Sequence, residues 1–209
     1  MTQNRSSAVM QQRSEPMRSL DDFPTPPWAT RALCEQLEAL GHDLPSQTVR
    51  EPAANRGFMV RPLAEHFAEV KASDIKDYGF GWRVEDYLFP FTIETVDWTI
   101  TNPPFTLADR FVERALDTSR VGCAVIVRVA FIEGIARYDR LFSKTPPSMV
   151  FQFVERVAMV QGKVDPDASS ATAYAWLVWL HGEHDTRLRW IAPCRKRLER
   201  PGDYPVEVV

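Results

Sequence analysis

The chain has 209 residues and a net charge of −3, with 44% hydrophobic and 25% charged residues. This length suits one α/β domain with small extensions, and the composition is that of an ordinary globular protein. The sequence pI of about 5.8 is unlike that of strongly basic nucleic-acid-binding domains. No apolar run reaches the roughly 18 residues of a membrane span, and the N-terminus lacks the pattern of a secretion signal.

The three cysteines, Cys34, Cys123 and Cys194, are odd in number and far apart. They match no metal-binding spacing and favour a reducing compartment. The sequence His181-Gly182-Glu183-His184 offers two histidines but no further ligands, so we interpret it as a polar turn. We therefore expect a cytoplasmic protein with no metal site and no membrane contact.

Residues 1–20 are polar and have no apolar period, which predicts a disordered arm. Residues 21–27 are turn-like, and after them segments with helical spacing alternate with strand-like segments. The predicted helices are 28–40, 58–67, 107–116 and 135–142. The predicted strands are 48–53, 70–75, 96–101, 122–129, 150–160 and 172–180.

This alternation predicts an α/β fold with a doubly wound, mostly parallel sheet. The apolar run 122–129 is typical of a strand buried on both faces. No clear helix separates the last two strands, which favours an antiparallel hairpin at one edge. We predict one domain over residues 21–185 and a basic extension over 186–209.

The extension carries six basic residues with a single acid, Glu199, among them. They are Arg187, Arg189, Arg195, Lys196, Arg197 and Arg200. Such a patch could follow a phosphate backbone even in an acidic chain. A solvated tail of no specific function is the alternative interpretation.

The tetrapeptide Asn102-Pro103-Pro104-Phe105 directly follows the predicted strand 96–101. The Asn side chain has a carbonyl acceptor. Proline has a fixed φ and no N–H group, so nearby backbone carbonyls are free to face a ligand. Phe105 offers a flat face for stacking. This combination suits a planar group that bears an amine, although Asn-Pro and Pro-Pro are also ordinary turn signals.

A second motif, residues 51–58, lies at a predicted strand-to-helix turn, where backbone N–H groups favour an anion. Gly57 accepts a positive φ freely, and Asn55 tolerates it. Asp74 ends the next strand, where an acid in nucleotide-binding α/β folds accepts hydrogen bonds from ribose. A plain structural corner and a solvated Asp are the alternatives.

Together these motifs resemble S-adenosylmethionine-dependent amino-group methyltransferases. The likeness is greatest to small phage or prophage-type adenine-N6 DNA methyltransferases without a separate target-recognition domain, and it spans about residues 21–180. It rests on Thr25-Pro26, Glu51-Pro52-Ala53-Ala54-Asn55-Arg56-Gly57, Asp74, Asp86-Tyr87-Leu88 and Asn102-Pro103-Pro104-Phe105, in this order. The resemblance implies the class I methyltransferase (Rossmann-like) fold, a seven-stranded, mostly parallel sheet with an antiparallel edge strand.

The resemblance also implies a cofactor site for S-adenosyl-L-methionine. Its residues would be Thr25, Pro26, Glu51, Ala53, Asn55, Gly57, Asp74, Ile75, Asp86, Tyr87 and Asn102. Asp74 would bind the cofactor ribose and Ile75 would pack on its adenine. Asp86, with Glu85 as a competing acid, would meet the exocyclic amine of that adenine. Asn55 replaces a glycine of the family pattern and adds bulk near the methionine part of the cofactor.

By the same resemblance, Asn102, Pro103, Pro104 and Phe105 would be the catalytic residues. Asn102 Oδ1 and the Pro103 carbonyl would accept the N–H groups of the target amine, direct its lone pair and stabilise the developing positive charge. Positioning would then supply much of the rate of in-line transfer, with no metal or covalent nucleophile. Phe105 would stack on the target ring, which duplex DNA must flip out.

The loop 162–171 is the predicted substrate-facing element. Its Lys163, Ser169 and Ser170 would bind the substrate together with Phe105. Ten residues is long for an ordinary hairpin loop, which is the alternative.

The implied function is methylation of an exocyclic amine in DNA, with adenine N6 as the first choice and cytosine N4 chemically close. RNA guanine-N2 or protein glutamine methyltransferases use related Asn-Pro-Pro-aromatic motifs and are the second interpretation. A catalytically silent cofactor- or DNA-binding protein is the third. Asn55 and the lack of a recognition domain support it, whereas the intact Asn102-Pro103-Pro104-Phe105 opposes it.

Overall fold

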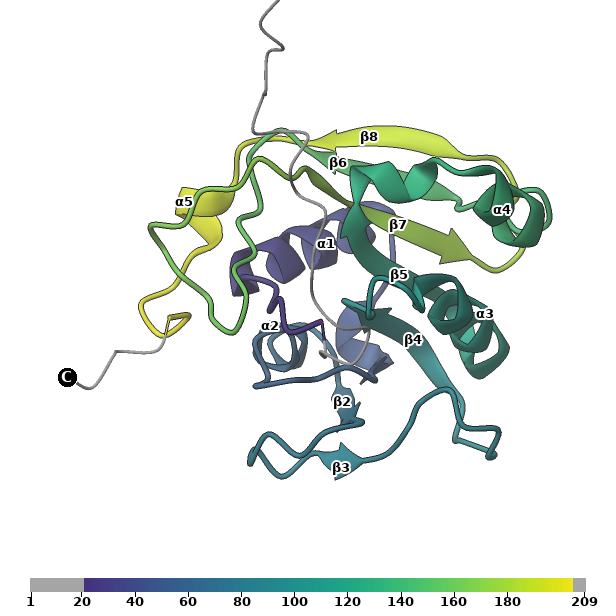
Figure 1. Ribbon diagram of the computed structural model, residues 1–209, viewed down its shortest axis with the longest axis horizontal. Helices are drawn as coiled ribbons and strands as arrows, with labels where there is room; N and C mark the ends of the chain where they lie inside the picture. Colours follow the sequence, from purple (N-terminus) through teal and green to yellow (C-terminus); the bar gives the residue numbers. More distant parts are fainter. Residues whose placement is uncertain (1–20, 205–209) are drawn as a thin grey trace, which may run out of the picture.

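Eight strands form a single sheet in the order β3-β2-β1-β4-β5-β7-β6-β8 (Figure 1). The computed structural model describes residues 21–204, so the arm predicted over residues 1–20 lies outside the described residues. The strands are β1 (Thr48–Glu51), β2 (Glu69–Asp74), β3 (Arg83–Val84), β4 (Val96–Thr101), β5 (Ser119–Arg128), β6 (Met149–Phe153), β7 (Tyr174–Leu180) and β8 (Arg187–Ile191). The helical segments are α1 (Pro27–Ala39), η2 (Leu44–Ser46), α2 (Val60–Ala64), α3 (Ala108–Thr118), η3 (Val129–Ile132), α4 (Ile135–Arg137), η4 (Tyr138–Phe142) and α5 (Arg195–Leu198).

The sheet is mostly parallel and contains one reversed strand. β3, β2, β1, β4 and β5 pair in parallel, as do β6 and β8, while β7 is antiparallel to both β5 and β6. The predicted α/β fold class is confirmed. Two details differ from the prediction. The sheet has eight strands rather than seven, and the reversed strand is internal because it pairs with β5 on one side and β6 on the other.

The edge strand β8 falls in the segment that we predicted to be a basic extension. Its residues pair in parallel with β6, from Met149↔Arg187 to Phe153↔Ile191. Four of its five residues are exposed and two of these are arginines, so the sequence shows no buried face that would predict a strand. Residues 187–191 therefore belong to the sheet.

Most other predicted elements are confirmed within a few residues, but two are shorter than predicted. The helix predicted over 58–67 is regular only over Val60–Ala64, with turns on either side. The strand predicted over 150–160 ends at Phe153. The apolar residues Val157 and Met159 that extended the pattern leave the sheet and pack into the core.

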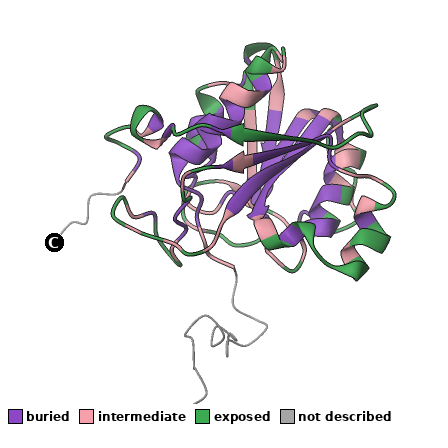
Figure 2. Ribbon diagram, turned by 90° about the horizontal axis from the view of Figure 1, so that it is seen from above, coloured by how far each residue is buried: buried purple, intermediate pink, exposed green. Residues whose placement is uncertain are grey.

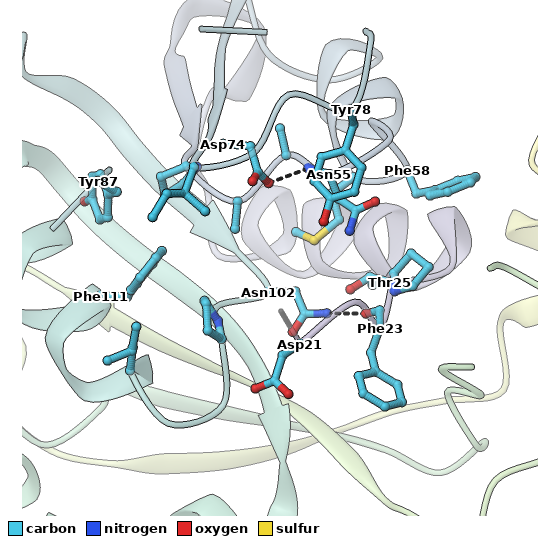
Figure 3. A pocket seen from close by; sticks show the side chains of 18 of the residues that line it. Asp21, Phe23, Thr25, Asn55, Phe58, Asp74, Tyr78, Tyr87, Asn102 and Phe111 are labelled. Atoms are coloured by element: carbon cyan, nitrogen blue, oxygen red, sulfur yellow. Dashed lines mark hydrogen bonds between the residues drawn. The ribbon is translucent and has the colours of Figure 1, made fainter. Parts of the chain in front are cut away.

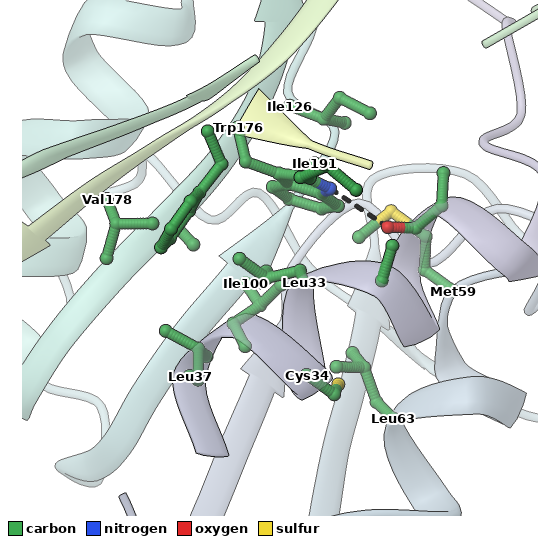
Figure 4. Close-up of a cluster of buried hydrophobic side chains, with 14 of the residues drawn as sticks. Leu33, Cys34, Leu37, Met59, Leu63, Ile100, Ile126, Trp176, Val178 and Ile191 are labelled. Carbon is green, nitrogen blue, oxygen red and sulfur yellow. Dashed lines mark hydrogen bonds between the residues drawn. The ribbon is translucent and has the colours of Figure 1, made fainter. Parts of the chain in front are cut away.

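Two hydrophobic clusters join the layers, and the strands between them are buried along most of their length (Figure 2). The first packs α1 and α2 on the sheet, and there Trp176 Nε1 donates a hydrogen bond of 3.0 Å to the Ala29 carbonyl (Figure 4). The second packs α3 and η4 on the opposite face. Within residues 21–204, no helix has both the length and the apolar character needed to cross a membrane.

Arg31 on α1 is a buried cation that connects three segments. It forms paired hydrogen bonds of 2.7 and 2.9 Å to Glu65 and of 2.7 and 2.8 Å to Asp203. It also donates to the Leu198 carbonyl at 2.7 Å. Arg31 and Asp203 are only 3% and 4% exposed. These bonds hold the C-terminal segment against α1 and α2.

Most of the basic residues after β7 are paired with acids. The pairs are Arg187–Glu183, Arg195–Glu199, Arg197–Glu35 and Arg200–Glu65. Within the described part of the chain, Arg189 and Lys196 alone among the six basic residues form no ion pair. This pairing favours attachment of the segment to the domain over the phosphate-binding role that the sequence allowed.

The turn between β1 and α2 depends on two residues with positive φ. Gly57 has φ +79°, and Asn55, at +48°, is the only residue other than glycine with a positive φ in residues 21–204. Trp82 Nε1 donates to the Asn55 carbonyl at 3.0 Å. A Cβ atom on Gly57 would lie 2.9 Å from Trp82 Cζ2. The turn therefore requires glycine at 57 for two reasons, its backbone angle and the indole beside it.

Removing the buried cation should destabilise the fold strongly. We expect Arg31→Met to lower the free energy of unfolding by about 3 to 5 kcal/mol, because Asp203 would stay buried without its partner. Urea denaturation of the whole chain measures this. Arg197→Met, which breaks the exposed pair with Glu35, should change it far less. Equal effects of the two substitutions would contradict the role of Arg31.

The glycine of the β1–α2 turn should tolerate alanine poorly. Positive φ alone costs an alanine about 1 to 2 kcal/mol, and the contact with Trp82 should raise the cost of Gly57→Ala by roughly 1 kcal/mol or more. Gly79→Ala is the matched control, since Gly79 has the same φ of +79° and no atom within 4 Å of an added Cβ. Thermal or urea denaturation that shows the same loss for both variants would rule out the contribution of Trp82.

Candidate functional site

A cavity of about 270 Å³ lies at the edge of the sheet where the parallel strands β1, β2 and β4 end (Figure 3). Four parts of the chain line it: residues 21–25, which we call the N-terminal segment, the turn after β1, residues 74–88 and the loop after β4. In the sheet β1 lies between β2 and β4, so the chain connections lead to opposite sides of the sheet at β1. Open α/β sheets bind ligands at such a point, beyond the carboxyl ends of the strands.

The structure brings most of the predicted cofactor and catalytic residues to this cavity. Those that line it are Thr25, Ala53, Asn55, Asp74, Ile75, Asp86, Tyr87, Asn102 and Pro104. They come from five short stretches of sequence, two of which fall within residues 74–88. The cavity therefore joins the motifs into one candidate site.

Other predicted residues lie beside the cavity or away from it. Pro26 precedes α1, Gly57 packs against Trp82, and Pro103 is buried. Lys163, Ser169 and Ser170 do not line the cavity. Lys163 pairs with Asp165 at 3.0 Å, and Ser170 Oγ accepts a hydrogen bond from the Thr172 backbone. Their loop reaches the site indirectly, because the Gly162 N–H donates to the Asp22 carbonyl at 2.8 Å.

Asn102 is oriented by the N-terminal segment. Its Nδ2 donates to the Phe23 carbonyl at 2.8 Å (Figure 3). A carbonyl can only accept a hydrogen bond, so this contact assigns the nitrogen to that side of the amide and the oxygen to the other. Asn102 Oδ1 accepts no hydrogen bond from residues 21–204. A residue that lines the cavity thus has a free carbonyl acceptor.

The N-terminal segment is fixed at two further points. The Phe105 N–H donates to Asp21 Oδ2 at 2.9 Å. On the other side, Asp22 accepts hydrogen bonds from Asn55 Nδ2 at 2.8 Å and from Arg56 at 2.9 and 3.0 Å. Burial opposes ionisation of Asp22, but the bonds from Arg56 and Asn55 outweigh it and lower its pKa. The segment is therefore bound both to the cofactor-motif turn and to the loop after β4.

Asp74 presents a positioned carboxylate at the end of β2. Its two oxygens accept the backbone N–H groups of Asn55 and Lys76, each at 2.9 Å. Burial raises the pKa of Asp74, while these hydrogen bonds favour its charged form. Each oxygen keeps a second lone pair for a ligand hydroxyl. Ile75 beside it is 57% exposed and supplies an apolar surface at the cavity wall.

Glu51 is fully buried and directly precedes Pro52 and Ala53, which line the cavity. Its Oε1 accepts hydrogen bonds from the Ala53 N–H at 2.9 Å and from the Thr101 hydroxyl at 2.7 Å. Its Oε2 is buried with no hydrogen-bond partner in the described structure. Burial, with a smaller contribution from Asp74, raises the pKa of Glu51 to about 8. A cation placed near this carboxyl would favour its ionised form.

Phe105 does not line this cavity and instead lines a second one of about 190 Å³. The guanidinium carbon of Arg128 lies 4.2 Å from the centroid of the Phe105 ring. The sequence analysis assigned no role in the site to Arg128, Asp21 or Asp22. Arg128 did carry a signal, because it is a charged residue at the end of the otherwise apolar run 122–129. Within residues 21–204, no group of three or more His, Cys, Asp or Glu side chains could hold a metal ion.

The chain matches no protein-family model and no curated protein. It does resemble solved structures. A Listeria monocytogenes protein described as a class I S-adenosylmethionine-dependent methyltransferase is 12% identical, with a TM-score of 0.61 over 83% of this chain and 67% of that chain. A Pyrococcus horikoshii protein described as an RNA methyltransferase is 18% identical, with a TM-score of 0.59 over 83% of this chain and 94% of that chain.

The methyltransferase subunit of a type I restriction-modification system from Streptococcus thermophilus is also similar. It is 10% identical, with a TM-score of 0.60, and the match covers 89% of this chain and 50% of that subunit. Such low identities bear on the fold alone. Together with the strand order and the reversed β7, they show that the chain has the class I methyltransferase fold.

Proposed function

We propose that the protein transfers the methyl group of S-adenosylmethionine to an exocyclic amine of a nucleic-acid base, with adenine N6 in DNA as the first candidate. The observation that carries this proposal is the free Oδ1 acceptor of Asn102, whose orientation is set by the bond from Nδ2 to Phe23. The cavity beside Asn102 supports it, since it is lined by most of the other residues that the resemblance assigns to the cofactor. The fold is also that of known S-adenosylmethionine-dependent methyltransferases.

The cofactor would lie across the carboxyl ends of β1 and β2. Asp74 would accept the ribose hydroxyls, and Ile75 would pack on the adenine, whose amine Asp86 would bind. The Thr25 hydroxyl is buried without a hydrogen-bond partner in the described structure, and with Pro26 it would border the methionine end. Glu51 would stabilise the positive charge of that end through its unpaired Oε2.

Asn55 fits this arrangement despite replacing a glycine. It adopts the positive φ that the turn needs, and its side-chain amide is turned to Asp22 and Arg56. Its backbone N–H binds Asp74. We infer that its bulk orders the N-terminal segment, which weakens the argument for a silent protein.

Catalysis would consist of orienting the target amine. Bound cofactor supplies a methyl group on a sulfonium, which is already a good leaving group. Asn102 Oδ1 and the Pro103 carbonyl would accept the two N–H groups of the amine, so that its lone pair points at the methyl carbon. The same two oxygens stabilise the positive charge that grows on nitrogen. The amine then loses a proton to solvent.

The substrate is proposed to be a nucleic acid because two of the similar structures are described as an RNA methyltransferase and as a restriction-modification methyltransferase subunit. DNA is the first choice on the motif order. RNA is the second candidate, because the likeness to the RNA methyltransferase covers 94% of that chain.

We expect Asn102→Ala to lower methyl transfer by about 100-fold or more while cofactor binding is kept. Transfer of labelled methyl groups to separate pools of duplex DNA, single-stranded DNA, RNA and cell protein measures this, and mass spectrometry identifies the modified group. Thr106→Ala, which alters the same cavity next to the catalytic motif, is the control and should stay active. Transfer that persists in Asn102→Ala would exclude this mechanism, and label in protein would exclude the substrate class.

The affinity for S-adenosylmethionine should rise with pH up to about pH 8. In the free protein Glu51 is protonated below its pKa of about 8. A bound cation lowers that pKa, so binding releases a proton and tightens by at most about tenfold per pH unit. Calorimetry at several pH values measures the slope. Glu51→Gln should remove the part of this pH dependence that is due to Glu51. Only the part due to the cofactor's own amine should then remain. An identical slope in wild type and variant would exclude this contact.

A further inference from the structure

Arg128 is a cation whose donors are unused. It ends β5, and its guanidinium stacks on the Phe105 ring at 4.2 Å. Within residues 21–204 its guanidinium makes no hydrogen bond and no ion pair, and its Nε is buried without a partner. A buried donor without an acceptor costs free energy that a ligand can restore. Its stacking on Phe105 compensates only in part, since a cation–π contact satisfies no N–H group.

A second arginine lines the same cavity. The guanidinium carbon of Arg137 is 4.1 Å from the centroid of the Phe131 ring. Its Nη1 donates to the carbonyls of Phe131 and Glu133, both at 2.7 Å, and it forms no ion pair in the described part of the chain. The two arginines and the two phenylalanines all line the cavity of about 190 Å³, together with small apolar residues and no acid. Asp109, which follows the lining residue Ala108, is already paired with Arg140 at 2.8 Å.

This arrangement has the chemistry of an anion site. A guanidinium binds a phosphate through a planar fork of donors. Because it is more weakly hydrated than an ammonium group, it is the usual choice for binding nucleic-acid backbones. The cavity is lined by Phe105, the last residue of the catalytic motif, whereas Asn102 and Pro104 of the same motif line the cofactor cavity. In a nucleic acid a phosphate lies one sugar away from each base. A base at Asn102 would therefore bring a phosphate close to this loop.

We propose that Arg128 and Arg137 bind a backbone phosphate of the nucleotide whose base is methylated, an inference that rests on the proposed function. Without substrate, the Arg128 guanidinium covers one face of Phe105, and Phe23 lies at the ring with a centroid distance of 5.8 Å. When Arg128 turns to the phosphate, its donors become satisfied and the Phe105 face becomes free. Phosphate binding and stacking of the base on Phe105 would thus be coupled.

The test is the salt dependence of binding by the full-length protein, because each phosphate contact adds a defined slope. Binding of a mixed-sequence DNA duplex, its single strand and the matching RNA is followed by fluorescence anisotropy between about 50 and 200 mM salt. The slope of log K against log[salt] is negative. In Arg128→Ala its magnitude should decrease by about 0.9 for duplex DNA or by about 0.7 for single strands. Arg128→Lys should keep the wild-type slope, since it keeps the charge. Arg128→Gln is a second neutral variant in case alanine impairs folding.

Lys196→Ala is the matched control, since Lys196 is exposed on α5 and forms no ion pair in the described residues. It should leave the slope unchanged, and S-adenosylmethionine binding should be unchanged in every variant. If the neutral Arg128 variants keep the wild-type slope while the wild type binds and methylates nucleic acid, the phosphate site is wrong and the proposed function stands. An equal fall in Lys196→Ala would also overturn the assignment. A wild type that binds cofactor but neither binds nor methylates nucleic acid overturns the proposed function, and the phosphate site with it.

Discussion

The hydrogen bond from Asn102 Nδ2 to the Phe23 carbonyl is the interaction on which the proposed site depends. An amide side chain has nearly the same shape in its two orientations, so its chemistry depends on whether its NH₂ group or its oxygen is already hydrogen-bonded. Here the donor end is held by the backbone of the N-terminal segment, and the acceptor end is left for a ligand. The bonds of Asp21 to Phe105 and of Asp22 to Arg56 hold that segment in place.

The parts of the site that the sequence predicts are those marked by a local pattern. Asp74 ends one readable strand and Asn102 directly follows another, and parallel strands bring their carboxyl ends together. Contacts between distant segments have no local pattern. The approach of Trp82 to Gly57 and of Arg128 to Phe105 depends on tertiary packing, and so neither was predictable. The strand β8 was missed for a related reason, since exposed arginines hide its pairing with β6.

The charges of this chain serve two different purposes. Arg31 and most of the basic residues near the C-terminus are paired with acids and attach one segment of the chain to another. Arg128, in contrast, has no acid beside it, although it lies closer to the catalytic motif than any of them. The number of arginines in a segment is therefore a poor guide to nucleic-acid binding in this fold. What matters is whether each guanidinium already has a partner.

The two edges of the sheet also bear on how the protein avoids self-association. An open sheet exposes unpaired backbone groups at both edges, and these can pair with the strands of another copy. One edge is β3, which has only two residues. The other edge is β8, where Arg187 and Arg189 alternate with Leu188 and Trp190. A short strand gives little to pair with, and a charged strand repels its own kind, so both edges oppose the growth of the sheet into aggregates.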